Sequence, residues 1–179
     1  GVELFTKIKR VAGVDFMVEI CKLAAERGSR VYLLGSGSDE VVKKTAEELK
    51  KKFSNLSIVG YDKGPVVDEL RITNHELWNE CLEKINLAKP NILFVAFGMG
   101  KQEKWIYENL NKIPNVKIAM GVGGSFDFIS GYIKRAPLFM RRLGLEWMYR
   151  LIQQPSRIGR IFNATLRFTW LALSRKNNV

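Results

Sequence analysis

Three glycine-containing stretches carry residue types that suit the binding of a phosphate group. They read GSGSDE at 35–40, FGMGKQEKW at 97–105 and GVGGSFDFISG at 121–131. Glycines let the backbone approach a ligand closely, and the free N–H groups at the start of a following helix attract anions. The candidate ligand-binding residues that these stretches supply are Gly35, Gly37, Gln102 and Asp127.

Each stretch also has a plainer interpretation, which the residues alone leave open. The first is equally typical of a tight turn that leads into a helix, and it lacks the third glycine of a dinucleotide-binding GxGxxG pattern. A solvated helix start explains Lys101 and Glu103 in the second as well as a ligand does. In the third, Asp127 lies between two phenylalanines and is either a nucleotide contact or a helix cap, and we favour the nucleotide contact.

The elements that must position these stretches alternate between strand and helix. Alternation of this kind predicts a Rossmann-like α/β fold, a parallel sheet with helices on both faces, and ligands bind such sheets at the C-terminal ends of the strands. A helix that precedes them is expected to be capped by Asp15 and to end at Gly28. The predicted strands are 30–35, 56–61, 91–98 and 116–121, and the predicted helices between them are 38–53, 74–88 and 101–111.

The pattern changes after Gly131, where two basic amphipathic helices are expected. Pro137 and Pro155 each suit a first helical turn, and they open stretches that run over 137–154 and 155–176. Residues 134–179 hold ten of the 29 Lys and Arg residues but one of the 18 Asp and Glu residues, so nearly all of the net charge of +11 lies there. We therefore expect an α/β core at 1–133 and a C-terminal appendage at 134–179 that contacts an anionic partner.

Several motifs are absent from the chain, and their absence narrows the chemistry. The sequence holds no HExxH, CxxC, GxSxG, Walker A lysine or DxD pair, so neither a metal nor a cofactor is expected. Cys21 and Cys81 stand apart, which favours a reducing compartment. No apolar run approaches the roughly 18–20 residues that span a bilayer. If a diphosphate is bound, arginine must offset its charge.

Four motifs in order resemble the WecG/TagA/CpsF glycosyltransferases over nearly the whole chain. They are RVAGVDF at 10–16, GMGKQEKW at 98–105, GVGGSFDFISGYIKRAP at 121–137 and GLEWMYRLIQQPSRIGR at 144–160. The resemblance implies an inverting, metal-independent enzyme of cell-surface polymer synthesis. Such an enzyme moves N-acetylmannosamine from UDP-ManNAc to GlcNAc-diphospho-undecaprenol in wall teichoic acid synthesis, and it works peripherally at the cytoplasmic face of the membrane.

The resemblance also implies roles for particular residues. Arg10 and Gln102 match positions of the active-site pocket, and Asp127 with its neighbours Gly123 and Gly124 lies where the nucleotide is expected. The arginines implied to stabilise the leaving diphosphate are Arg150, Arg157 and Arg160.

Two departures from the family pattern stand out. The family commonly has a proline where this chain has Gly100, so we expect a more mobile second loop. Family members also begin with a further segment that ends in a PDG-like motif, and its aspartate is the proposed general base. That base is therefore expected upstream of Gly1.

The expected partners are a UDP-sugar donor, a polyprenyl-diphosphate-linked acceptor and an anionic membrane surface. Packing of the appendage on the core or on a second subunit is the plainer alternative, so a homo-oligomer stays open. Two other function classes also stay open, a basic nucleic-acid-binding module and an NAD-dependent Rossmann enzyme. The excess of basic over acidic residues is concentrated in the tail, which disfavours nucleic acid as a partner, and the missing third glycine disfavours the dehydrogenase.

Overall fold

A computed structural model describes residues 11–65, 75–143 and 145–153 of the 179-residue chain. The chain divides into two compact units, Gly1–Tyr132 and Ile133–Val179, and each is described by itself. The first unit holds the sheet and the glycine-rich stretches, and the second holds the start of the basic C-terminal region.

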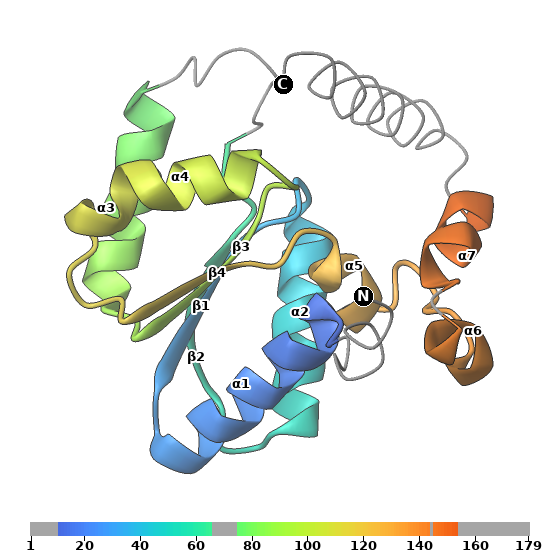
Figure 1. The fold of residues 1–179 in the computed structure, drawn as a ribbon. Helices are drawn as coiled ribbons and strands as arrows, with labels where there is room; N and C mark the ends of the chain where they lie inside the picture. The colour runs from blue at the N-terminus through green and yellow to red at the C-terminus, as the bar shows by residue number, and fades with distance from the viewer. Residues whose placement is uncertain (1–10, 66–74, 144, 154–179) are drawn as a thin grey trace, which may run out of the picture. The chain divides into compact units, whose positions relative to one another are not determined.

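The first unit is built on one four-stranded sheet in which every pairing is parallel (Figure 1). The strand order is β2-β1-β3-β4, so β1 and β3 are the inner strands. This architecture confirms the predicted α/β fold with helices on both faces of a parallel sheet. The elements of this unit are α1 (Gly13–Arg27), β1 (Arg30–Gly35), α2 (Asp39–Lys52), β2 (Ser57–Asp62), α3 (His75–Ala88), β3 (Ile92–Ala96), α4 (Lys101–Asn109), the short 3₁₀ helix η2 (Leu110–Lys112), β4 (Ile118–Gly121) and α5 (Ser125–Ile129).

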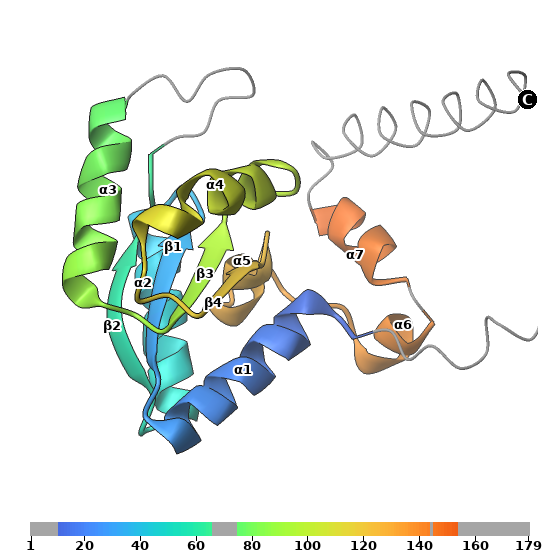
Figure 2. The ribbon, with the colours of Figure 1, turned by 60° about the vertical axis from the view of Figure 1, so that its left-hand side comes forward.

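Helices cover both faces of this sheet, as Figures 1 and 2 show. Helices α1, α2 and α5 pack on one face, and α3 and α4 pack on the other. Successive residues of a strand point to opposite faces, so each inner strand contributes to two hydrophobic cores. In β1, Val31 and Leu33 join the core of the first face, and Tyr32 and Leu34 join the core of the second. Such two-sided burial explains why these strands read as continuous apolar runs.

Helix α1 differs at its start from the expectation and agrees with it at its end. The N-cap is Ala12 and not Asp15, so the predicted cap is wrong. Asp15 instead lies in the first turn, where an acidic side chain interacts favourably with the positive end of the helix dipole. At the other end, Gly28 adopts a left-handed conformation with φ of 63°, and its N–H bonds to the carbonyl of Ala24.

In the second unit, the region expected to form one helix over 137–154 forms two. Helix α6 (Leu138–Arg142) begins after Pro137, and α7 (Glu146–Gln153) follows it. The single-helix prediction is wrong at this point. Leu145 donates its N–H to the carbonyl of Met140 at 2.9 Å. A bond of this kind commonly ends a helix where a glycine follows the C-cap residue. The sequence has a glycine at 144, a residue type that also disfavours a continuous helix. The helix expected over 155–176 lies outside the described residues.

Several apolar side chains in the described part of the second unit are exposed. Leu138, Phe139 and Leu143 are 62%, 63% and 69% exposed, and Ile152 of α7 is 72% exposed. Gln153 stabilises the unit internally, because its carboxamide both accepts from the backbone N–H of Lys134 and donates to its carbonyl, at 3.1 and 2.8 Å.

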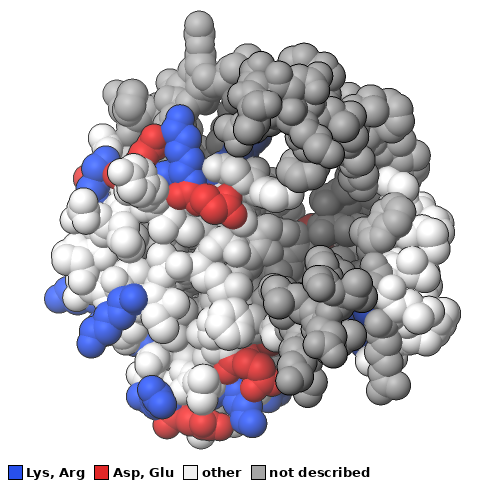
Figure 3. All heavy atoms as spheres, viewed as in Figure 1, with Lys and Arg blue, Asp and Glu red and all other residues white. Residues whose placement is uncertain are grey.

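Charges of both signs are interspersed on the face of the molecule drawn in Figure 3, as the near balance of acidic and basic residues in 1–133 predicts. Within the part of the chain that the structure describes, no helix is long and apolar enough to cross a bilayer.

Candidate functional site

The three glycine-rich stretches follow three neighbouring strands of the sheet. Strand β3 pairs with β1 on one side and with β4 on the other, and all three run in the same direction. Their last residues, Gly35, Ala96 and Gly121, therefore lie at one edge of the sheet (Figure 1). This is the edge at which open parallel sheets bind ligands.

The first loop is held close to the end of β3. A Cβ atom added to Gly35 would lie 2.8 Å from both the carbonyl carbon and the oxygen of Ala96, and the φ of Gly35 is +111°. Ser36 then donates its N–H to the carbonyl of Ala96 at 3.0 Å. Gly37 also has a positive φ, of 70°, but open space surrounds its Cα. The first glycine is thus required for close packing and the second for backbone conformation alone.

The second loop is anchored at its start by an aromatic cluster. The ring of Phe97 lies edge-on to Trp78 and to Trp105, with ring centroids 5.4 and 5.8 Å apart. Beyond Phe97, Gly98 and Gly100 both have positive φ, and Met99 between them is 91% exposed. The start of the loop is thus packed against aromatic rings, and its tip is exposed.

Gln102 joins the second loop to the third. Its side chain is buried, and its Oε1 accepts the backbone N–H of Gly123 at 2.8 Å. Space for this side chain exists because Gly121 has none: a Cβ there would lie 2.6 Å from Gln102 Nε2 and 2.8 Å from its Cδ. Two predicted ligand-binding residues, Gln102 and Gly123, are thus brought into direct contact.

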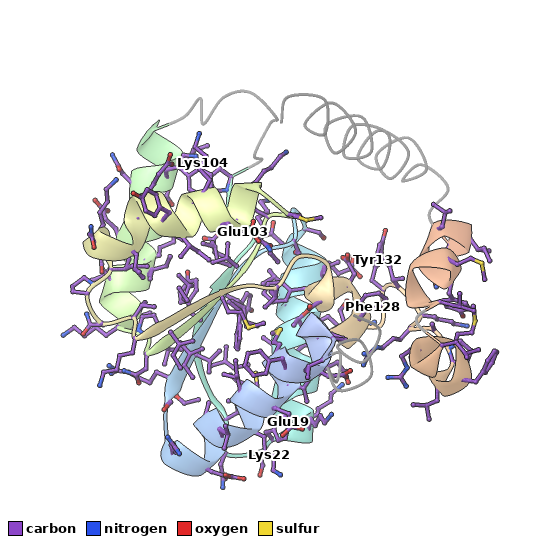
Figure 4. All side chains as sticks on the ribbon, in the orientation of Figure 1. Glu19, Lys22, Glu103, Lys104, Phe128 and Tyr132 are labelled. Carbon is purple, nitrogen blue, oxygen red and sulfur yellow. The ribbon has the colours of Figure 1, made fainter. Side chains whose placement is uncertain are left out.

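Glu103 completes this connection at the N-terminal end of α4, where Figure 4 shows it beside the loops at the sheet edge. Its Oε1 accepts from Gln102 Nε2 at 2.8 Å, and its Oε2 accepts the backbone N–H of Gly100 at 2.6 Å. Burial acts to raise the pKa of Glu103, but the hydrogen bonds from Gln102, from its own backbone and from Gly100 outweigh it and hold that pKa below its ordinary value.

Gly100 adopts a backbone conformation that the proline common in the family could not adopt. Its φ is +83°, whereas a proline ring fixes φ near −65°. A proline would also lack the N–H that Gly100 donates to Glu103. The bond between Gly100 and Glu103 is therefore a feature of this chain's own sequence.

The third loop is tied to β3 and leads into α5. Val122 donates its N–H to the carbonyl of Val95 at 2.8 Å, and the hydroxyl of Ser125 donates to the carbonyl of Val122 at 2.6 Å. Gly123 has a φ of +52°, and Gly124 is the N-cap of α5. Asp127 lies in the first turn of this helix and is half-buried, so the structure excludes the alternative in which it is the N-cap.

Helix α5 is itself anchored to α2 by a buried hydroxyl. Thr45 Oγ1 lies 3.1 Å from the carbonyl oxygen of Phe126 and 2.7 Å from that of Val41 in its own helix. Phe126 is fully buried in the core that α1, α2 and α5 share. The third loop is therefore fixed at both of its ends.

Several predicted site residues are not placed by the structure. Arg10, Arg157 and Arg160 lie outside the described residues, and Arg150 falls within α7 without a described side chain.

Both cysteines are buried, and burial raises the pKa of each thiol to about 12, so neither is a ready nucleophile. Among the residues with described positions, no cluster of three or more His, Cys, Asp and Glu side chains could hold a metal ion.

Gly121 is not among the predicted site residues, and the sequence leaves Glu103 undecided between a ligand contact and a solvated helix start. A signal for the structural role of Glu103 is present in the sequence, because an acid three residues after a helix N-cap is half of a capping box. Its carboxylate does accept from the N–H of the N-cap residue, Gly100. No local signal marks Gly121, since its role depends on a side chain 19 positions away in the sequence.

Comparison with known proteins places the chain in a family. The sequence profile described as "Glycosyl transferase WecG/TagA/CpsF family" matches residues 4–179. The chain belongs to this glycosyl transferase family. The family membership agrees with the resemblance carried by the four motifs.

Two curated relatives carry the same name, N-acetylglucosaminyldiphosphoundecaprenol N-acetyl-beta-D-mannosaminyltransferase. One is from Bacillus spizizenii and the other from Bacillus subtilis, and each is 36% identical to this chain over 154 residues. The matched region covers 86% of this chain and 56% of each relative. The chain thus spans a little over half the length of these WecG/TagA/CpsF family members.

Proposed function

We propose that this chain transfers N-acetylmannosamine from UDP-ManNAc to GlcNAc-diphospho-undecaprenol, in the synthesis of wall teichoic acid. The observation that carries the proposal is its 36% identity, over 86% of its length, to enzymes named for this transfer. Glycine loops gathered at one edge of a parallel sheet support it, because a nucleoside diphosphate suits such an edge. No feature of the residues that the structure describes favours the nucleic-acid module or the dehydrogenase.

The donor would bind along the three loops. Backbone N–H groups near Gly35, Gly37 and Gly124 would face the diphosphate, and Asp127 and Gln102 would lie beside the nucleotide. Arg10 would contribute from the pocket position that the family resemblance gives it. In this arrangement 1–133 is the nucleotide-sugar-binding core.

The transfer would be a single displacement with inversion. The acceptor hydroxyl attacks the anomeric carbon as the bond from that carbon to the UDP oxygen breaks, and UDP leaves with the bonding electron pair. The hydroxyl proton passes to a general base, a role that the family resemblance gives to the aspartate of the PDG-like motif. Arg150, Arg157 and Arg160 would offset the negative charge that develops on the leaving diphosphate, as guanidinium groups can without a metal.

The acceptor is a lipid, which supports a peripheral position at the cytoplasmic face of the membrane. Residues 134–179 would make this attachment through their excess of nine positive charges. Each basic residue near an anionic surface contributes about 1 kcal/mol. Exposed apolar side chains of α6, among them Leu138 and Phe139, would add buried area.

Release of UDP from UDP-ManNAc by this chain joined to the segment that carries the PDG-like motif, followed with and without a soluble GlcNAc-diphospholipid, tests the proposal. We expect acceptor-dependent release that EDTA leaves unchanged. Alanine at Arg150, Arg157 or Arg160 should lower turnover about 100-fold, as the loss of other transition-state donors does. Binding of NAD or RNA in place of UDP would contradict the proposed activity.

A further inference from the structure

The second and third loops are linked by a continuous chain of hydrogen bonds. Gly123 donates to Gln102, Gln102 donates to Glu103, and Gly100 donates to the other oxygen of Glu103, at 2.8, 2.8 and 2.6 Å. Gly100 and Gly123 belong to different loops and follow different strands. Their separation is thus fixed by two side chains at the start of α4.

The partners of Gln102 determine which way its carboxamide faces. An ionised carboxylate only accepts hydrogen bonds and a backbone N–H only donates them. The nitrogen of Gln102 must therefore face Glu103, and its oxygen must face Gly123. A carboxamide turned by 180° would set two acceptors against each other at Glu103 and two donors at Gly123.

Packing adds to this constraint. Gln102 is 5% exposed, and its side chain fills the space above Gly121 where a Cβ would clash with it. A buried polar group that loses its partner costs about 1–3 kcal/mol. The carboxamide is thus committed to its contacts within the protein on both of its polar ends.

We propose that Gln102 and Glu103 are positioning residues that hold the second and third glycine loops at a fixed separation, with Glu103 orienting the carboxamide of Gln102. The consequence for a nucleotide at these loops rests on the proposed function, whereas the coupling of the loops does not. Gly100 takes part through its N–H, which a proline at that position would lack.

The order of donors and acceptors along this chain of hydrogen bonds allows variants that break the pairing and a double change that restores it. Glu103→Gln replaces one acceptor with a donor, so either Gly100 or Gln102 loses its partner. Gln102→Glu sets two carboxylates against each other and is expected to be the more severe change. The double change Gln102→Glu with Glu103→Gln restores a donor for every acceptor along the chain of bonds.

Amide hydrogen exchange measured by NMR on the full chain, without ligand, tests the coupling. Glu103→Gln should accelerate exchange about tenfold at Gly123, whose N–H bonds to Gln102 and not to Glu103. Gln102→Glu should do the same or more, and the double change should bring the rate back toward wild type. The matched control is Glu108→Gln, at the other end of α4, where the carboxylate pairs with Lys104 at 3.8 Å.

Unchanged exchange at Gly123 in Glu103→Gln would overturn the proposal, as would a double change no better than Gln102→Glu. If Gln102→Glu fails to fold, folding of the double change with wild-type exchange at Gly123 would support the proposal, and failure of both to fold would contradict it.

Calorimetry with UDP tests the positioning role of Gln102 and Glu103 separately from the proposed function. If wild type binds UDP, the single changes should weaken binding and the double change should restore it, and equal affinities would reject the positioning role. Absence of UDP binding in wild type would reject the proposed function and leave the loop coupling to be decided by exchange.

Discussion

Gly123 donates its backbone N–H to the side-chain oxygen of Gln102 at 2.8 Å, across 21 residues of sequence. This bond crosses from the loop after β4 to the first turn of α4, which follows β3. It joins two of the loops at this edge of the sheet directly to each other.

Gly121→Ala should destabilise the protein because the added Cβ would occupy the place of the Gln102 carboxamide. We expect a loss of about 1–3 kcal/mol in the free energy of unfolding, measured by urea denaturation. The control is Gly13→Ala at the start of α1, where nothing lies within 4 Å of an added Cβ. That change should leave stability equal or raise it by up to about 1 kcal/mol. Equal losses in the two variants would contradict the packing described at Gly121.

Gly35→Ala and Gly37→Ala separate close packing from backbone strain. Both glycines have positive φ, so alanine at either costs about 1–2 kcal/mol. At Gly35 the new Cβ also meets the backbone of Ala96 at 2.8 Å, whereas at Gly37 it meets open space. Thermal denaturation should therefore show the larger loss for Gly35→Ala. A ranking in the opposite order would show that β1 and β3 do not approach each other in this way.

The stability that Glu103 contributes should depend on pH. Its folded-state pKa lies below the ordinary value of 4.5, so the contribution is fully present above that value and is lost as the pH falls through the lower, folded-state pKa. Urea denaturation of wild type and Glu103→Gln between pH 7 and pH 3 measures this. The difference between the two proteins should shrink toward acid, and a constant difference would mean that ionisation of Glu103 does not contribute.

Phe139→Asp should weaken membrane attachment if residues 134–179 make it. Phe139 is 63% exposed, and burial of such a side chain contributes about 1.5–3 kcal/mol, so binding to anionic liposomes should fall about tenfold or more. Leu87→Asp in α3, where the leucine is 82% exposed, is the matched control and should sediment with the liposomes like wild type. Equal sedimentation of both variants would remove α6 from the attachment surface.

Much of the fold could be predicted because the strands carry an unambiguous signal. Leu93 to Val95 lie in a run whose members are buried on both faces, and such runs between helical stretches specify a parallel sheet. The helix ends are harder to predict, since several residues can cap a helix. The sequence favours Asp15 as the N-cap of α1, whereas Asp15 lies in the first turn. The break after α6 was missed because proline and amphipathic spacing favoured a longer helix.

The site was predictable in its location but not in its internal connections. Glycines after strand ends indicated where a ligand would bind, and Gln102 was recognised as a candidate. Its bond to Gly123 and the space that Gly121 provides arise only when distant segments meet in the folded protein. Adjacent polar residues at a helix start look solvated in sequence, which is why Glu103 was left undecided between a surface role and a ligand contact.

Titration of the ¹⁵N-labelled chain with UDP-ManNAc, in buffer that contains EDTA, tests most directly whether the glycine loops bind a sugar nucleotide. We expect saturable shifts in the amide resonances of Gly35, Gly37, Gly123 and Gly124. The amide resonance of Gly28, which precedes β1 at the opposite edge of the sheet, should not shift. Absence of binding, or shifts confined to residues away from the three loops, would contradict the assignment of this edge as the donor site.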